Sequence, residues 1–396
     1  MKEKLKQIAL HHQGLTDAAS TGRKPNVAQV VKSLGYLQID TISVVSRAHH
    51  HTLWNRIPEY RTEYLDKALK ERRIFEFWYH AASYLPIEDY RFRIPLLLSV
   101  WPGAMKHFSA VSKKLEKHVL ERIRAEGPLQ SRDFDSARIS SAWGNKKHSS
   151  QALEKLFFQG DLMISARNNM QKVYDLTERV LPSEIKTKPP TADEFCEFLV
   201  DSTLKAHGFT TMAQLTHLRK GKEIRSNLSK ILEQRIEEGS VIKVEENGIP
   251  AVFALTKSLH SRKMARQEGV RILSPFDNLV IHRERLSQIF GFDYRIECYV
   301  PKEKRRYGYF CLPILHRGEI VGRADCKAHR RNRVFELINL YLETSNVNRQ
   351  EFTTEFVTEL KCFAEFNECD RIIISGAQPV SLQKMMIREL SRLGES

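Results

Sequence analysis

The sequence predicts an α+β protein in which helix-rich units with two-stranded hairpins precede a C-terminal antiparallel β module with flanking helices. Three observations predict this class. The first eighty residues show helical periodicity followed by a strand-like run, and a helix–hairpin pattern recurs later in the chain. Beyond residue 271 the apolar period changes to two, which is typical of strands.

The N-terminal part shows helices followed by a short sheet, the outline of a winged helix-turn-helix unit. Asn26 is a suitable N-cap for the second helix and Gly35 a suitable terminator. A loop is expected at 17–24. The expected helices are 3–12, 26–34, 46–56 and 64–70, and the expected strand is 73–78.

An internal repeat extends this outline to three units. Residues 153–162 and 172–177 align without a gap to 232–241 and 251–256, each as a helix, a glycine stop and a hairpin with a polar tip. Residues 65–77 fit the same template more loosely. We therefore predict tandem winged helix-turn-helix units at 1–110, 111–186 and 191–258, followed by a β-rich module at 259–396 with strands at 295–300, 307–315, 319–326 and 333–340 and a helix at 354–366.

The charge balance favours a polyanionic partner. Lys and Arg exceed Asp and Glu by 15 over 396 residues, and no apolar segment is long enough to cross a bilayer. Nucleic acid is the leading candidate, although ribosome-associated and membrane-surface proteins share such a balance. The six cysteines form no CxxC pair and no signal peptide is present, which predicts a cytoplasmic, nucleoid-associated protein with reduced thiols.

The segment Gln38-Ile39-Asp40 is the centre of the functional argument. In an extended chain, residues two apart share a face, so Gln38 and Asp40 would project together while Leu37 and Ile39 anchor in the core. A carboxylate beside a carboxamide can hold a water molecule. The same triplet is also the ordinary pattern of a half-buried strand.

The residues that follow are basic and aromatic. Adjacent helical positions point about 100° apart, so His49, His50 and His51 cannot converge on one metal ion. They could instead line a groove and contact phosphates or a base edge, or form a solvated face. The aromatic run at 76–80 could stack on a base or belong to the core. The basic runs at 302–306 and 329–333 suit phosphate contacts, and Asp277 could lie near the groove or act as a structural cap.

The chain resembles the YcaQ-like (AlkX/AlkZ-type) bacterial DNA glycosylases, tandem winged-helix proteins that unhook interstrand crosslinks. The resemblance is carried by blocks spread over nearly the whole chain: LGYLQIDT (34–41), SRAHHHTLWNR (46–56), FEFWYHAASYLP (75–86), LSPFDNLVIHRER (273–285), FGFDYRIECYVPKEKRRYGYFCL (290–312) and VGRADCK (321–327). The family's catalytic motif, Gln-apolar-Gln or Gln-apolar-Asp, matches Gln38-Ile39-Asp40 in its Asp version. His51 is an extra histidine, and it leaves open which histidine faces DNA.

The resemblance implies a monofunctional DNA glycosylase that releases N7-alkylguanine and unhooks crosslinks in base excision repair. Gln38 and Asp40 are the expected catalytic residues, with no metal or cofactor. The expected partner is double-stranded DNA carrying alkylated or crosslinked guanine, bound by a monomer without a membrane. The expected DNA contacts are Arg47, His49, His50, Trp54, Arg56, Asp277, Arg283, Lys304, Arg305 and Arg323.

Two other functions use the same features. A winged-helix transcriptional regulator would also be basic and would bind duplex DNA without chemistry. A nuclease is disfavoured, because no carboxylate cluster for two metal ions is present.

Overall fold

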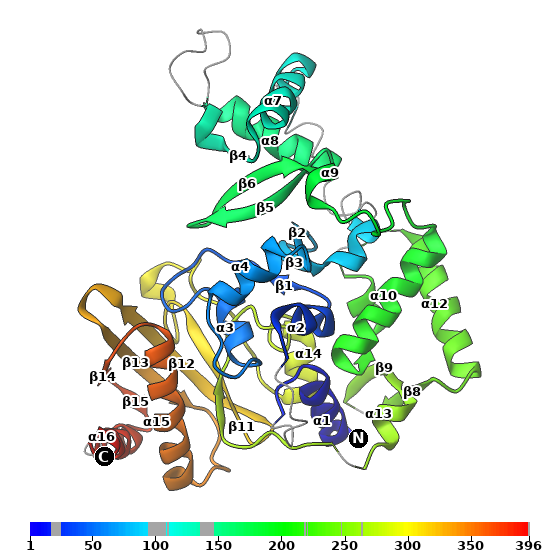
Figure 1. Ribbon diagram of the computed structural model, residues 1–396. Coiled ribbons are helices and arrows are strands. Elements are labelled where there is room, and N and C mark those ends of the chain that lie inside the picture. The colour runs from blue at the N-terminus through cyan, green and yellow to red at the C-terminus, as the bar shows by residue number, and fades with distance from the viewer. Residues whose placement is uncertain are drawn as a thin grey trace.

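The computed structural model describes residues 1–16, 25–93, 108, 111–134, 146–217, 219, 221–246, 248–262 and 264–394. The loop expected at 17–24 lies outside these residues. The described elements confirm the α+β class (Figure 1). No helix in these ranges is long and apolar enough to span a lipid bilayer.

Three small sheets share one topology, in which the first, short strand pairs with the third and the third pairs with the second. This arrangement is consistent with three winged-helix units. Unit 1 contains α2 (Val27–Leu34), β1 (Leu37–Gln38), α3 (Ala48–Trp54), α4 (Glu63–Lys70), β2 (Ile74–Trp78) and β3 (Ala82–Pro86), followed by the 3-10 helix η1 (Ile87–Phe92). Unit 2 contains α7 (Lys113–Glu126), β4 (Leu129–Gln130), η2 (Ser131–Phe134), α8 (Lys146–Gln159), β5 (Leu162–Asn168), β6 (Gln171–Leu176) and α9 (Thr177–Val180). Unit 3 contains α10 (Ala192–His207), β7 (Phe209–Thr210), α11 (Met212–Leu215), α12 (Lys222–Glu237), β8 (Val241–Glu246), β9 (Ile249–Leu255) and α13 (Thr256–His260).

The start of β1 is set by local signals that the sequence analysis anticipated. The side chain of Asn26 accepts the N–H of Gln29, whose own side chain accepts the N–H of Asn26, and this capping box begins α2. Gly35 ends the helix with φ +79°, a conformation that L side chains rarely adopt. The chain therefore leaves α2 and enters β1 within two residues.

The C-terminal module contains one mixed sheet in the order β10-β11-β12-β13-β14, with β15 also paired to β13. β10 to β13 are antiparallel, whereas β14 and β15 run parallel to β13 after the crossover helix α15. The elements are α14 (Arg283–Arg285), the π-helical turn η3 (Leu286–Phe290), η4 (Lys302–Lys304), η5 (Arg330–Asn332), α15 (Arg349–Phe366), α16 (Val380–Gly394), and the strands β10 (Val270–Ile272), β11 (Cys311–His316), β12 (Glu319–His329), β13 (Val334–Leu342), β14 (Arg371–Ile374) and β15 (Ala377–Gln378).

The prediction of a strand at 295–300 is wrong. This segment is irregular and turns at 298–299. The carboxylate of Glu297 accepts the backbone N–H groups of Arg306, Tyr307 and Gly308 at 3.0, 2.8 and 3.1 Å, and these bonds close the loop onto itself. The alternation of apolar and polar residues could not reveal that the Glu297 carboxylate, and not a neighbouring strand, accepts these backbone N–H groups.

The hydrophobic clusters do not follow the linear order of the units. In α1 (Lys2–His12), Leu5 and Ile8 pack with Phe209 of unit 3 and with residues of the C-terminal module. Leu37 and Ile39 belong to the core of unit 1, whereas Val45 belongs to that of the C-terminal module. The segment from Leu37 to Val45 therefore runs from one core to another.

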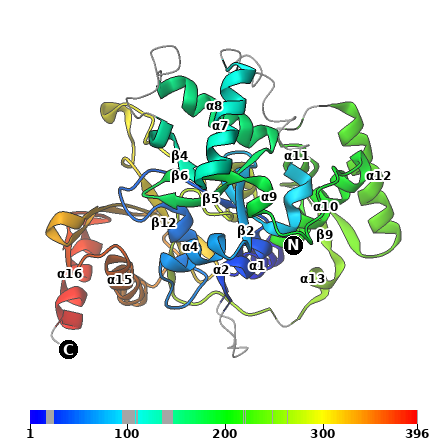
Figure 2. The same ribbon diagram turned by 45° about the horizontal axis from the view of Figure 1, so that its top comes forward.

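Unit 2 is joined to unit 1 through a buried ion pair. Figure 2 places β5 and β6 beside β2. The guanidinium group of Arg167, near the hairpin tip of unit 2, donates two hydrogen bonds of 2.7 Å to Glu76 on β2. Lys172 Nζ also lies 3.8 Å from Glu76 Oε1, so the buried carboxylate of β2 is held by two cations of unit 2.

Candidate active site

β1 holds the Gln-Ile-Asp motif in an extended conformation, as expected. Gln38 lies opposite Ser83 of β3, and the N–H of Ile39 donates to the carbonyl of Ala82 at 2.8 Å. Leu37 and Ile39 are buried in the core of unit 1. Leu37 and Ile39 thus anchor the segment as predicted, whereas Gln38 is buried as well and Asp40 is half-buried.

Gln38 is held by a histidine that the sequence analysis did not assign to the site. Its side chain is 8% exposed, and His80 Nε2 lies 2.8 Å from Gln38 Oε1. His80 comes from the turn between β2 and β3, beyond the Trp78–Ala82 pair. The strand order β1-β3-β2 explains this contact. Because β1 pairs with β3, the turn that joins β2 to β3 lies beside Gln38.

Asp40 is half-buried, and its Oδ1 accepts the N–H of Ile42 at 2.7 Å. Burial raises the pKa of this carboxyl group above its usual value, and the bond to Ile42 opposes the increase only in part. The carboxylate faces the turn at 298–299. The pKa of Cys298 is raised by burial and then by the charge of Asp40, and the pKa of Tyr299 is raised by Cys298, by burial and then by Asp40. Tyr299, which is 79% exposed, is a second residue that the sequence analysis missed.

The three consecutive histidines have different environments. His51 is 0% exposed, with Nε2 bonded to the Ile272 carbonyl at 2.8 Å and its ring packed on Phe363. His49 is also buried. His50 is partly exposed, with Nδ1 at 2.8 Å from the Tyr60 hydroxyl. Of the three, His50 therefore best fits a DNA contact, whereas His49 is covered in this structure, and a contact of either ring with DNA stays a prediction.

Burial makes these histidines weak bases. It lowers the pKa of His49 well below the ordinary value and the pKa of both His50 and His51 to about 4. The nearby charge of Arg47 also lowers the pKa of His49 and His50. The rings are consequently neutral at pH 7. Within the described residues, no group of three or more His, Cys, Asp or Glu side chains is arranged to hold a metal ion.

Arg56 and Asp277, two of the expected DNA contacts, pair with each other in the interior of this structure. Arg56 Nη1 and Nη2 donate to Asp277 Oδ2 and Oδ1 at 2.6 and 2.9 Å, and Asp277 is 0% exposed. Arg56 also donates to the Gln13 carbonyl at 2.7 Å. This pair joins α3 to the C-terminal module, so the reading of Asp277 as a structural residue is the one supported.

Three further side chains that were expected to contact DNA have partners within the protein. Arg323 is buried, donates to Glu343 at 2.5 Å and lies 4.0 Å from the centre of the Tyr307 ring. Arg283 donates to the Pro275 and Val280 carbonyls, and Trp54 stacks on Phe366 with ring centres 5.5 Å apart. Trp54 and Arg283 are partly exposed and Arg323 is covered in this structure, and their contacts with DNA stay predictions.

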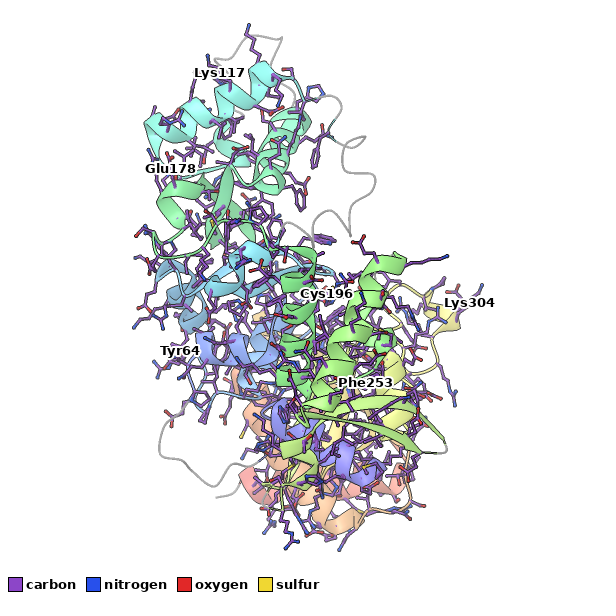
Figure 3. All side chains as sticks on the ribbon, turned by 90° about the vertical axis from the view of Figure 1, so that its right-hand side faces the viewer. Tyr64, Lys117, Glu178, Cys196, Phe253 and Lys304 are labelled. Carbon is purple, nitrogen blue, oxygen red and sulfur yellow. The ribbon has the colours of Figure 1, made fainter. Side chains whose placement is uncertain are left out.

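Three of the cationic side chains expected to contact DNA remain at least partly exposed. Lys304 is exposed and lies at the margin of the molecule in Figure 3. Arg305 Nε donates to the Val300 carbonyl at 2.9 Å, and its charge lowers the pKa of Cys298, beside Asp40. Arg47, at the start of α3, is partly exposed. Their roles in DNA binding stay predictions.

The motif thus lies where three parts of the chain meet. Unit 1 supplies Gln38, Asp40 and His80, and the C-terminal module supplies Tyr299 and Arg305. From unit 3, the charges of His217 and Arg219 act on His80 and lower its pKa, although burial is the larger cause. A cavity between units 1 and 3 is lined by Tyr36, His80 and Arg219, among others, and Asp40 lies outside this lining.

Comparison with known proteins identifies the family. The family described as DNA glycosylase AlkZ-like matches residues 31–366. The fold is similar to that of the Streptomyces sahachiroi DNA glycosylase AlkZ, with a TM-score of 0.62 and 14% sequence identity, over 94% of this chain and 98% of that chain. The match over most of the chain shows that this protein belongs to the AlkZ-like family and is a DNA glycosylase.

Proposed function

We propose that this DNA glycosylase hydrolyses the N-glycosidic bond of N7-alkylguanine, both as a monoadduct and in an interstrand crosslink, during base excision repair. The observation that carries the proposal is Asp40, a half-buried carboxylate that has a raised pKa and is not among the residues lining the cavity between units 1 and 3. On nucleoid DNA the chain would act alone, without a second copy.

The chemistry requires little more than a carboxylate and a directed water molecule. N7-alkylguanine is cationic and leaves without protonation. Water oxygen bonds to C1′ while the C1′–N9 bond breaks, the bond's electron pair neutralises the departing base, and Asp40 takes the water proton. The carboxylate also stabilises the positive charge that develops on the sugar. Gln38 orients the water or holds the sugar-phosphate.

The electrostatics near β1 suit a cationic base. His49, His50, His51 and His80 have lowered pKa values and are neutral at pH 7, so these four rings add no charge that would repel the lesion. Arg47, His50, Lys304 and Arg305 are the side chains proposed to contact DNA. Phosphate contacts of this kind dominate affinity for duplex DNA.

The position of Asp40 favours lesions that cannot be flipped completely. A crosslinked base stays tied to the opposite strand, so it cannot enter a deep pocket. A half-buried carboxylate where several modules meet can instead approach the sugar of a base that remains near the duplex. This geometry supports the crosslink as a substrate in addition to the monoadduct.

One assay tests the proposal. The protein is incubated with duplex DNA containing N7-methylguanine in the presence of a chelator, and strand breaks are measured before and after alkali. Breaks that arise only after alkali indicate base release to an abasic site. Breaks before alkali would indicate a lyase or nuclease, and binding without any abasic sites would favour a regulator or another substrate. A nitrogen-mustard crosslink in the same duplex then tests unhooking.

A further inference from the structure

The contact between His80 and Gln38 gives the carboxamide a direction. The ring nitrogen Nε2 lies 2.8 Å from the carbonyl oxygen Oε1, not from the amide nitrogen. A carbonyl oxygen only accepts hydrogen bonds, so the ring must donate from Nε2. The amide NH2 of Gln38 is then directed away from His80.

The surroundings of His80 keep its ring neutral and fixed. The ring meets Tyr36 edge-on with centres 4.9 Å apart and lies 5.7 Å from Tyr79. Burial, followed by the charges of His217 and Arg219, lowers the pKa of His80 to about 4. A neutral imidazole has a single N–H, which the bond to Gln38 places on Nε2 and which leaves Nδ1 with a lone pair.

We propose that His80 is a positioning residue that donates Nε2–H to Gln38 Oε1 and thereby turns the Gln38 amide NH2 toward the substrate. This inference rests on the proposed function and makes it more specific. Gln38 becomes a hydrogen-bond donor at the site and Asp40 the acceptor. A water molecule that receives an N–H from Gln38 and donates an O–H to Asp40 keeps a lone pair for C1′, so the polarity of the pair orients the nucleophile.

Without His80 the amide could adopt either of two orientations. In the flipped orientation Oε1 takes the place of the NH2 group. The water molecule would then have no N–H donor from Gln38, and Oε1 would face Asp40 as a second acceptor. A neutral hydrogen bond of ordinary strength biases such an equilibrium by about 5- to 10-fold. If the two orientations are equally populated without His80, the correctly oriented fraction falls from roughly nine tenths to about one half, so the expected loss of rate on removing His80 is about 2-fold.

A double-mutant cycle tests this coupling in the full chain. Single-turnover base release and DNA affinity are measured for His80→Ala, Gln38→Met and the double variant. We expect His80→Ala to slow base release by about 2-fold with DNA affinity unchanged, and to have no further effect when Gln38 is already Met. The control is His12→Ala, another half-buried histidine, which bonds Ser258 instead and should leave the rate unchanged. Additive effects of the two substitutions would overturn the inference.

A second measurement does not depend on activity. The nitrogen and proton shifts of the His80 ring, measured by NMR with labelled histidine, distinguish the two neutral tautomers. We expect Nε2–H, and an Nδ1–H ring would overturn the inference even if His80→Ala is slow. If the wild-type chain releases no alkylguanine, the proposed function fails while the tautomer still tests His80. If it releases base normally but the cycle is additive, only the role of His80 fails.

Discussion

Units 1 and 2 begin their sheets with the same two residues. β1 is Leu37-Gln38 and β4 is Leu129-Gln130. Each leucine lies opposite a tyrosine of the third strand, Tyr84 in unit 1 and Tyr174 in unit 2, and each glutamine is buried. The two sheets therefore offer the same scaffold for a polar side chain.

The residues after the glutamine make the difference. In unit 1 the chain stays extended through Ile39, and Asp40 remains half-exposed. In unit 2 the chain turns at once into η2, and Asp133 Oδ2 accepts the N–H of Gln130 at 2.7 Å. Both acids are half-exposed and each accepts one backbone N–H, Asp40 from Ile42 and Asp133 from Gln130. The sheet alone does not create a catalytic carboxylate, because the path of the next three residues decides whether the acid closes back onto the strand, as Asp133 does, or lies beyond it, as Asp40 does.

The partners of the two glutamines differ as well. Gln38 Oε1 is bonded to His80, whereas the buried Gln130 Oε1 has no hydrogen-bond partner among the described residues. Near the hairpin tip of unit 2, Arg167 is bound to Glu76 of unit 1 and not to a residue of β4. The comparison therefore predicts that equivalent substitutions in the two units will have unequal effects on activity.

The largest expected effect is that of Asp40→Asn against Asp133→Asn. Loss of the carboxylate at position 40 should reduce single-turnover base release by at least about 100-fold, the scale of removing a general base or electrostatic group. Asp133→Asn should leave the rate within about 2-fold, because an amide oxygen can still accept the Gln130 N–H. DNA affinity, measured by fluorescence anisotropy, should be unchanged in both. Normal base release by Asp40→Asn would remove Asp40 from the mechanism.

The sequence predicted this contrast only in part. Periodicity and capping signals identified the helix that ends at Gly35, the extended motif and the buried Leu37 and Ile39. Local pattern does not determine which charges pair across the chain. Arg56 meets Asp277 from a position 221 residues away, so a plausible DNA contact became a buried ion pair. His80 was missed for the same reason, since its role depends on strand order.

The next effect compares the two glutamines. Gln38→Ala should slow base release by about 10-fold, the factor for one hydrogen bond lost at the reacting centre. Gln130→Ala should not change the rate, because the proposed catalytic acid, Asp40, belongs to unit 1. The measurement is single-turnover release at saturating protein. Equal losses in the two variants would mean that the glutamines support the fold rather than the reaction.

A smaller effect concerns the loop that faces Asp40. Replacing Lys304 and Arg305 with alanine should weaken duplex binding uniformly across sequences and reduce the slope of log affinity against log salt by about 2, which corresponds to two lost phosphate contacts. The matched control replaces Lys384 and Arg388, which are exposed on α16. A change of slope in the control but not in the loop variant would place the DNA on another surface.

The smallest effect is on stability, and it should have opposite signs in the two units. The pKa of Asp40 is raised in the folded state, so ionisation of this carboxyl group at neutral pH lowers the stability of the fold. The loss of stability appears as the pH rises from the unfolded pKa through the folded pKa, and it is absent at lower pH. Asp40→Asn should therefore match or exceed the wild-type Tm at pH 7, by about 2 °C at most, with no difference near pH 3. Asp133→Ala removes the acceptor of the Gln130 N–H and should destabilise by about 1 kcal/mol. Thermal unfolding at the two pH values measures both, and a lower Tm for Asp40→Asn at pH 7 would mean that the carboxylate is structural, as Asp133 is.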